Sequence, residues 1–143
     1  MEISINYLAV VLAVIANFVL GYLWYTPLFG KAWAKEMKLD TSEKPKAGVM
    51  LRGMLMMVIG NFLMAYVLAH DVFAWNHVPG MEDMKTGLSA VLTTSFFIWL
   101  GYYVPTHIGA TTWEQRSWKL TFINLAYHFL TLFVAALIII KMG

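Results

Sequence analysis

Four long apolar runs, separated by polar breaks, decide what this chain can fold into. About 20 helical residues cross the roughly 30 Å hydrocarbon core of a bilayer, and each run supplies that length. Apolar residues make up 60% of the 143 and charged residues only 13%, whereas soluble domains are about 25% charged. The mean hydropathy is +0.67. We therefore predict an all-α, polytopic membrane protein with a single domain over residues 1–143.

The apolar runs and their flanking residues give approximate bounds for a bundle of four transmembrane helices. Pro27 is expected to end the first helix, and Pro105 to follow the end of the third, because proline lacks an N–H and disfavours helical geometry in the preceding residue. The first run has neither preceding basic residues nor a small-residue cleavage site, so we interpret it as a retained helix and not as a signal peptide. The predicted helices cover residues 3–25, 47–69, 86–104 and 118–140.

A short amphipathic helix is predicted over residues 28–39, at the membrane surface. Aromatic side chains recur at spacings of four on one side of it, and lysines project on the other. A solvated basic loop with scattered aromatic residues is the alternative. The predicted interfacial anchors are the aromatic and basic side chains of this region: Trp24, Tyr25, Phe29, Lys31, Trp33 and Lys35.

Basic residues are divided unevenly between the two sides of the predicted bundle. With four crossings, the first and third connections share one side, and both termini share the other. Eight Lys and Arg residues fall in or beside the first group, against Lys85 and Lys141 alone in the second. The positive-inside rule then places the first and third connections in the cytoplasm. We predict a multi-pass membrane protein with both termini on the non-cytoplasmic side.

This topology predicts the location of a reporter fused after Gly143. We expect a topology reporter at this position to give its non-cytoplasmic signal, because the basic connections retain the opposite side in the cytoplasm. A cytoplasmic signal from the fusion would overturn the predicted orientation.

Polar side chains near the middle of the predicted helices form a candidate site. Asn124 and His128 are four residues apart and share a helix face, and counting from the helix ends gives Asn17 and Asn61 a similar depth. Polar groups in hydrocarbon are costly unless paired, so these residues mark either a functional pathway or hydrogen bonds between helices. The predicted pathway for a substrate or ion consists of these four residues and Tyr127.

Three classes of function remain open on this pattern. The first is a small oligomeric channel or transporter for a small solute or ion, and the alternative is a non-catalytic membrane scaffold or partner subunit. The third is a binder of, or an enzyme acting on, a lipid-soluble molecule. Such a molecule would be held among Trp99, Tyr102, Tyr103 and Tyr127.

Small residues recur at every fourth position of the first predicted helix. Ala9, Ala13, Asn17 and Gly21 share one face, and such a face lets another helix approach closely. We therefore expect the protein to form a homo-oligomer in the lipid bilayer.

No catalytic residue, cofactor or metal site is predicted. The chain has no cysteine, no Gly-rich phosphate loop, no Gly-x-Ser-x-Gly and no His-Glu-x-x-His segment. Every Asp and Glu is expected at a helix end or in a connection, where His70, Asp71, His77, Glu82 and Asp83 match no metal motif. Nucleic acid is not an expected partner, because the basic residues lie where the membrane topology requires them.

Two segments resemble a known protein family. Residues 23–33, Leu-Trp-Tyr-Thr-Pro-Leu-Phe-Gly-Lys-Ala-Trp, and residues 123–128, Ile-Asn-Leu-Ala-Tyr-His, are similar to a bacterial family of small four-helix membrane proteins classed as a domain of unknown function. The resemblance extends over essentially the whole chain. It implies a four-span inner-membrane protein, and it supplies no substrate, cofactor or catalytic residue.

Overall fold

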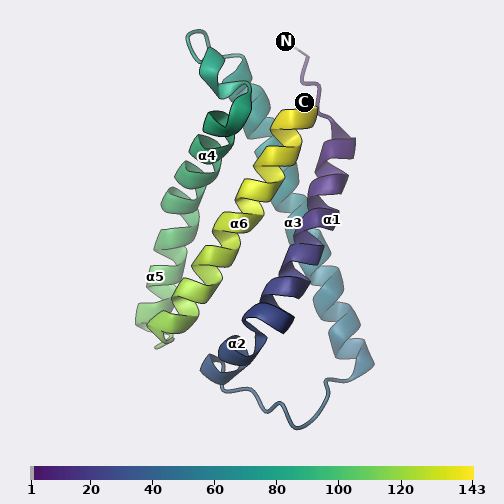
Figure 1. The fold of residues 1–143 in the computed structure, drawn as a ribbon, viewed down its shortest axis with the longest axis vertical. Coiled ribbons are helices and arrows are strands. Elements are labelled where there is room, and N and C mark those ends of the chain that lie inside the picture. The colour runs from purple at the N-terminus through teal and green to yellow at the C-terminus, as the bar shows by residue number, and fades with distance from the viewer. Residues whose placement is uncertain (1) are drawn as a thin grey trace.

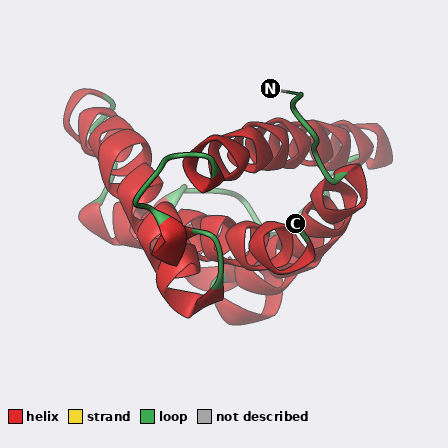
Figure 2. Ribbon diagram, turned by 90° about the horizontal axis from the view of Figure 1, so that it is seen from above, coloured by secondary structure: helices red, strands yellow, loops and turns green. Residues whose placement is uncertain are grey.

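The computed structural model describes residues 2–143, and these residues form helices and loops without a strand (Figure 1, Figure 2). Within them, four helical segments are long and apolar enough to cross a membrane, which confirms the predicted all-α, four-span fold. The segments are Tyr7–Leu28, Ala47–Asn76, Gly87–Trp113 and Trp118–Met142. Both termini lie at one end of the bundle, here called the termini end, and the short helix α2 lies at the other, the α2 end (Figure 1).

The first span consists of α1, Tyr7–Leu23, and a π-helical turn, Trp24–Leu28. Pro27 lies inside this turn, and the Phe29 N–H donates to the Trp24 carbonyl at 2.8 Å, five residues back. A π turn is wider than an α turn, so it accommodates a proline that has no N–H to donate. The helix therefore ends just after Pro27 and not before it.

The third span also contains a π turn. It consists of α4, Gly87–Ile98, the turn Trp99–Tyr103, and α5, Val104–Trp113. The sequence prediction ended this helix at residue 104, whereas the structure continues it through Pro105. Proline offers no N–H to the preceding turn and crowds its carbonyl groups, and the wider π turn directly before α5 accommodates both effects.

The second span, α3, covers Ala47–Asn76 and is longer than the predicted 47–69. The prediction ends at residue 69 because the polar pair His70 and Asp71 follows it. No proline or glycine interrupts the chain between Gly60 and Asn76, so the helix continues through both residues. The carboxylate of Asp71 therefore lies within a spanning helix, which corrects the expectation that every acidic residue lies at a helix end or in a connection.

The helix α2, Gly30–Glu36, follows the first span and lies across the end of the bundle (Figure 1). It falls within the predicted amphipathic segment. Trp33 is half-buried with its ring 5.5 Å from that of Tyr25, while Lys31 and Lys35 are exposed. Apolar and basic side chains are thus separated on the two sides of α2, as the sequence predicted.

The last span, α6, Trp118–Met142, lies in the middle of the bundle and packs against α1, α3 and α4. Small residues make this close approach possible. Ala9 and Ala13 of α1 are 1% and 0% exposed, and Ala135 and Ala136 of α6 are both 0% exposed. The small-residue face that suggested a homo-oligomer is therefore covered within one chain, and it is not free to bind a second copy.

Two tryptophans attach the flanking spans to the backbone of α6. The Trp24 indole N–H donates to the Ile123 carbonyl at 3.2 Å, and the Trp99 indole N–H donates to the Leu125 carbonyl at 2.8 Å. Each tryptophan begins one of the two π turns. Trp24 was predicted to be an interfacial anchor, and its hydrogen bond shows that it also joins α1 to α6.

The Trp99 contact predicts a stability difference between two conservative substitutions. Trp99→Phe removes the indole hydrogen bond and should lower the free energy of unfolding by about 1 kcal/mol. The control is Trp113→Phe, because Trp113 is 87% exposed. Unfolding in detergent micelles, followed by circular dichroism, measures both. Equal stability of the two variants would contradict a structural role for the Trp99 hydrogen bond.

Candidate functional site

The structure separates the predicted pathway residues into three places. Asn17 lies in the dry contact between α1 and α6, where it is 0% exposed and its Nδ2 donates to the Thr131 carbonyl at 3.1 Å. Its Oδ1 has no hydrogen-bond partner within residues 2–143. Asn17 thus joins two helices, and the structure does not place it on a cavity wall.

Asn124 lies about two turns before Thr131 in α6, beside the π turn of the first span. Its Oδ1 accepts a hydrogen bond from the Tyr25 hydroxyl at 2.7 Å. The Tyr25 ring also meets the Tyr127 ring edge to face at 4.9 Å. Tyr25, predicted as an interfacial anchor, therefore also connects the π turn of the first span to α6.

The other three predicted residues, Asn61, Tyr127 and His128, line one cavity. This cavity, here called the polar cavity, has a volume of about 300 Å³. It lies where α3, the second π turn and α6 meet. Its lining consists of Met57, Gly60, Asn61, Met64, Tyr103, Tyr127, His128 and Thr131.

Several polar groups of the polar cavity lack hydrogen-bond partners in the described chain. Asn61 Nδ2 donates to the Met57 carbonyl at 3.0 Å, one turn back in α3, which leaves Asn61 Oδ1 as a free acceptor. No hydrogen bond among residues 2–143 uses the hydroxyls of Tyr103 and Tyr127 or the ring nitrogens of His128. Polar groups inside a membrane protein are normally paired, so this convergence makes the polar cavity the candidate binding site.

His128 lies among three other rings. The ring centroids are 4.7 Å apart for Tyr103, 4.9 Å for His107 and 5.3 Å for Tyr127. The sequence reasoning missed His107, because it ended the third span before Pro105 and so placed His107 beyond the helix. Since the helix continues, His107 lies on α5 beside α6. No sequence signal marks this continuation, because the π turn before Pro105 is a feature of the folded backbone.

The hydrogen bond of His107 fixes which of its nitrogens is free. Its Nδ1 lies 2.9 Å from the Tyr103 carbonyl, and because a carbonyl only accepts, Nδ1 is the donor. In the neutral ring the lone pair is then on Nε2. No group of three or more His, Asp or Glu side chains that could hold a metal ion occurs in the described part of the chain.

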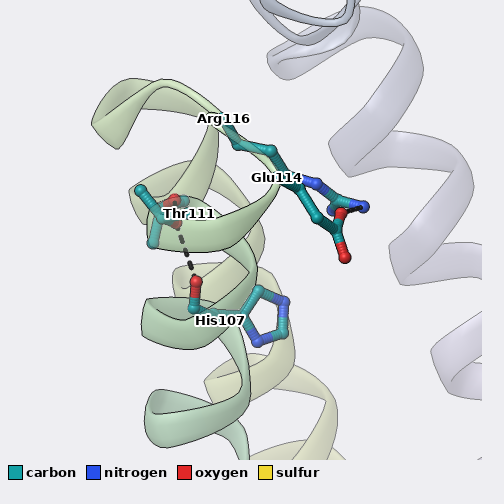
Figure 3. A network of polar contacts seen from close by, with 5 residues as sticks. His107, Thr111, Glu114 and Arg116 are labelled. Atoms are coloured by element: carbon teal, nitrogen blue, oxygen red, sulfur yellow. Dashed lines mark hydrogen bonds and ion pairs between the residues drawn. The ribbon is translucent and has the colours of Figure 1, made fainter.

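A hydroxyl network fixes α5 against α6 beside these rings (Figure 3). The Thr111 hydroxyl donates to the His107 carbonyl at 2.7 Å and is hydrogen bonded to the Thr121 hydroxyl of α6. In the turn that follows, Arg116 and Glu114 form an ion pair at 2.5 Å. These contacts determine where α5 meets α6, and so they determine the position of His107.

Two further cavities continue the polar cavity along α3. A cavity of about 330 Å³ shares Met64 and Tyr103 with it, and a third, of about 370 Å³, shares Asp71 and Tyr102 with the second. Together the three cavities form a groove between α3 and the third span, here called the α3–α4 groove. It runs from His128 toward the termini end, and Asp71 lines it.

The arrangement suits an amphipathic small molecule, with a polar group at one end and an apolar body. Tyrosine hydroxyls donate, the Asn61 carbonyl oxygen accepts, and a neutral imidazole does both. Met57 and Met64 supply flexible apolar walls. The geometry therefore provides a polar end at His128 and an apolar length along α3.

Gly21 of α1 controls the wall of the polar cavity. A Cβ at this position would lie 1.9 Å from Met57 Cε and 2.9 Å from Tyr127 Oη. Gly21→Ala should therefore displace both side chains and leave the protein less stable than Gly53→Ala by about 1 kcal/mol, since both substitutions gain the same helix propensity. Gly53→Ala is the control, because a Cβ there meets nothing within 4 Å. Unfolding of both variants in detergent measures the difference, and a Gly21→Ala protein as stable as Gly53→Ala would refute this packing.

Comparison with known proteins identifies the family. A family model described as protein of unknown function (DUF1761) matches residues 8–140, a stretch that contains nearly all of the four spans. This match confirms the resemblance seen in the sequence. No curated protein and no solved structure is significantly similar to the chain. The chain has four helices long and apolar enough to cross a membrane, and it belongs to the DUF1761 family, whose description assigns no activity.

Proposed function

We propose that this protein binds a lipid-soluble small molecule in the α3–α4 groove, with the polar group of that molecule in the polar cavity. One observation carries the proposal. Four side chains with free hydrogen-bonding groups in the described chain, Asn61, Tyr103, Tyr127 and His128, converge on one cavity among the spanning helices. In hydrocarbon such groups are costly unless a partner occupies the cavity.

Lateral access from the bilayer supports a lipid-soluble ligand. Val67 lines the middle cavity of the groove and is 63% exposed on a spanning helix, so the groove borders the lipid. A cavity of about 300 Å³ is within the range that small ligands occupy. A molecule with a hydroxyl or carbonyl head and an apolar body fits this combination of free donors, free acceptors and apolar walls.

A carrier is the second candidate, and the continuity of the groove supports it. The shared lining residues Met64, Tyr103, Asp71 and Tyr102 join the polar cavity to the termini end. The predicted pathway as a whole is less suited to conduction, because Asn17 is engaged in a helix–helix contact. Flux of protons, potassium or chloride into liposomes tests this candidate. A carrier should raise the flux above that of protein-free liposomes, and His128→Leu should lower it.

A scaffold is the remaining alternative. Some polar residues join helices, as a scaffold requires, and others line the polar cavity without joining helices. Asn17 and Asn124 are of the first kind. Asn61 bonds only to its own helix within the described chain, so it contributes no such connection. A protein that binds no small molecule and conducts no ion would be left with the scaffold role.

Photolabelling tests the proposed binding site. The probe is decanol carrying a diazirine beside the hydroxyl, added to the protein in phosphatidylcholine nanodiscs. We expect saturable labelling of the α3 and α6 peptides that line the polar cavity, with competition by plain decanol. Asn61→Leu should raise the half-saturating concentration about fivefold, the effect of one lost hydrogen bond of about 1 kcal/mol.

Two controls make the labelling experiment specific. Asn76→Leu makes the same change in the same helix at a residue that does not line the polar cavity, and it should leave labelling unchanged. A dodecane diazirine without a hydroxyl should label lipid-facing side chains without saturation. Labelling by the decanol probe that does not saturate, or that Asn61→Leu leaves unchanged, would reject the proposed site.

A further inference from the structure

The cavity at the termini end of the α3–α4 groove combines one carboxylate with three aromatic side chains. Its volume is about 370 Å³. Asp71 and Trp75 contribute from α3, one turn apart on the same face, and Phe97 contributes from α4. The full lining is Asp71, Trp75, Met81, Thr93, Thr94, Phe97, Ile98 and Tyr102. We propose that this cavity, here called the Asp71 cavity, binds a lipophilic organic monocation.

The depth of Asp71 makes its charge significant. No Asp, Glu, Lys or Arg occurs in α3 between Arg52 and Asp71. This uncharged length is about 28 Å at roughly 1.5 Å per residue, close to the thickness of the hydrocarbon core. Asp71 therefore lies at the boundary of the hydrocarbon, where an ionisable side chain facing the bundle marks a functional site and calls for a partner.

The described chain supplies no counter-ion for Asp71. The ion pair found among residues 2–143 joins Arg116 to Glu114, at the α2 end. Lys85, the cation closest to Asp71 in sequence, lines a separate cavity with Asn76. Glu82 and Asp83 directly follow Met81, which lines the Asp71 cavity, so the charges nearest this entrance in sequence are also negative. The electrostatics therefore favour a cation from outside the chain.

The aromatic lining selects an organic cation over a metal ion. Calcium and magnesium take six or more oxygen ligands, whereas Asp71 is the single carboxylate of a cavity otherwise lined largely by apolar and aromatic side chains. Trp75, Phe97 and Tyr102 line the cavity, and aromatic rings attract alkylated ammonium and pyridinium groups. The apolar walls then accommodate the hydrophobic body of the same molecule.

This inference does not depend on the function proposed for the polar cavity. The two cavities share no lining residue, and they communicate only through the middle cavity of the groove. Substitutions at Asp71 and at Asn61 therefore test the two proposals separately.

A pair of matched probes tests the Asp71 cavity. The first is the fluorescent monocation 4-(4-dimethylaminostyryl)-N-methylpyridinium, and the second is its neutral counterpart without the N-methyl group. Both are titrated into protein in phosphatidylcholine nanodiscs, with empty nanodiscs subtracted. We expect saturable binding of the monocation that is at least tenfold tighter than binding of the neutral probe.

Four variants locate the binding. Asp71→Asn keeps the side-chain shape and should weaken binding of the monocation at least tenfold, whereas Asp71→Glu keeps the charge and should retain most of it. Asp83→Asn removes a charge that does not line the cavity and should change the dissociation constant less than twofold. Asn61→Leu should leave binding of the monocation unchanged, which separates this result from the polar cavity.

The outcomes that would overturn the proposal are equally specific. Undiminished binding of the monocation by a folded Asp71→Asn protein would show that the carboxylate is not the partner. Equal affinity for the cationic and neutral probes in the wild-type protein would overturn the proposal without any variant, so the test stands even where Asp71→Asn fails to fold.

Discussion

The rest of this structure depends on the requirement that backbone groups in hydrocarbon satisfy their hydrogen bonds within the protein. A bilayer offers no water to a freed N–H or carbonyl, so a proline in a spanning segment cannot simply break the helix. Here Pro27 and Pro105 are accommodated in or directly after π turns, in which the hydrogen bonds reach five residues back. The chain thereby keeps its helices continuous, and the wider turns redirect the residues that follow.

The second consequence of the hydrocarbon environment concerns how the helices associate. Lipid tails are as apolar as the side chains, so burial of leucine does not drive helices together. Close packing of small residues does, and Ala9, Ala13, Ala135 and Ala136 bring α1 onto α6. Indole hydrogen bonds to α6 carbonyls from Trp24 and Trp99 add direction to this packing. The helix α6 therefore holds the bundle together, because α1, α3 and α4 all pack against it.

The polar side chains within the spans have two different physical roles. Those in dry contacts, such as Asn17 on Thr131, reach across to a neighbouring helix and hold it. Those on the α3–α4 groove, such as Asn61, bond within their own helix or keep free groups in the described chain. Side chains of the first kind fix the bundle. Side chains of the second kind remain available to a ligand, and this separation supports both binding proposals.

The sequence by itself determined the four spans, the all-α class, the amphipathic segment after the first span and the family, because apolar length and local spacing encode them directly. It also identified Asn61, Tyr127 and His128 as polar residues inside the membrane. Only the tertiary structure decided that these three share a cavity with Tyr103 while Asn17 and Asn124 do not. Depth along a helix can be counted from the sequence, whereas the direction in which a residue faces depends on how neighbouring helices pack. The π turn in the third span adds to this, since its extra residue rotates the side chains that follow it, and His107 is one of them. Asp71 became visible as a site residue for another reason, because α3 continues beyond the predicted end of the second span.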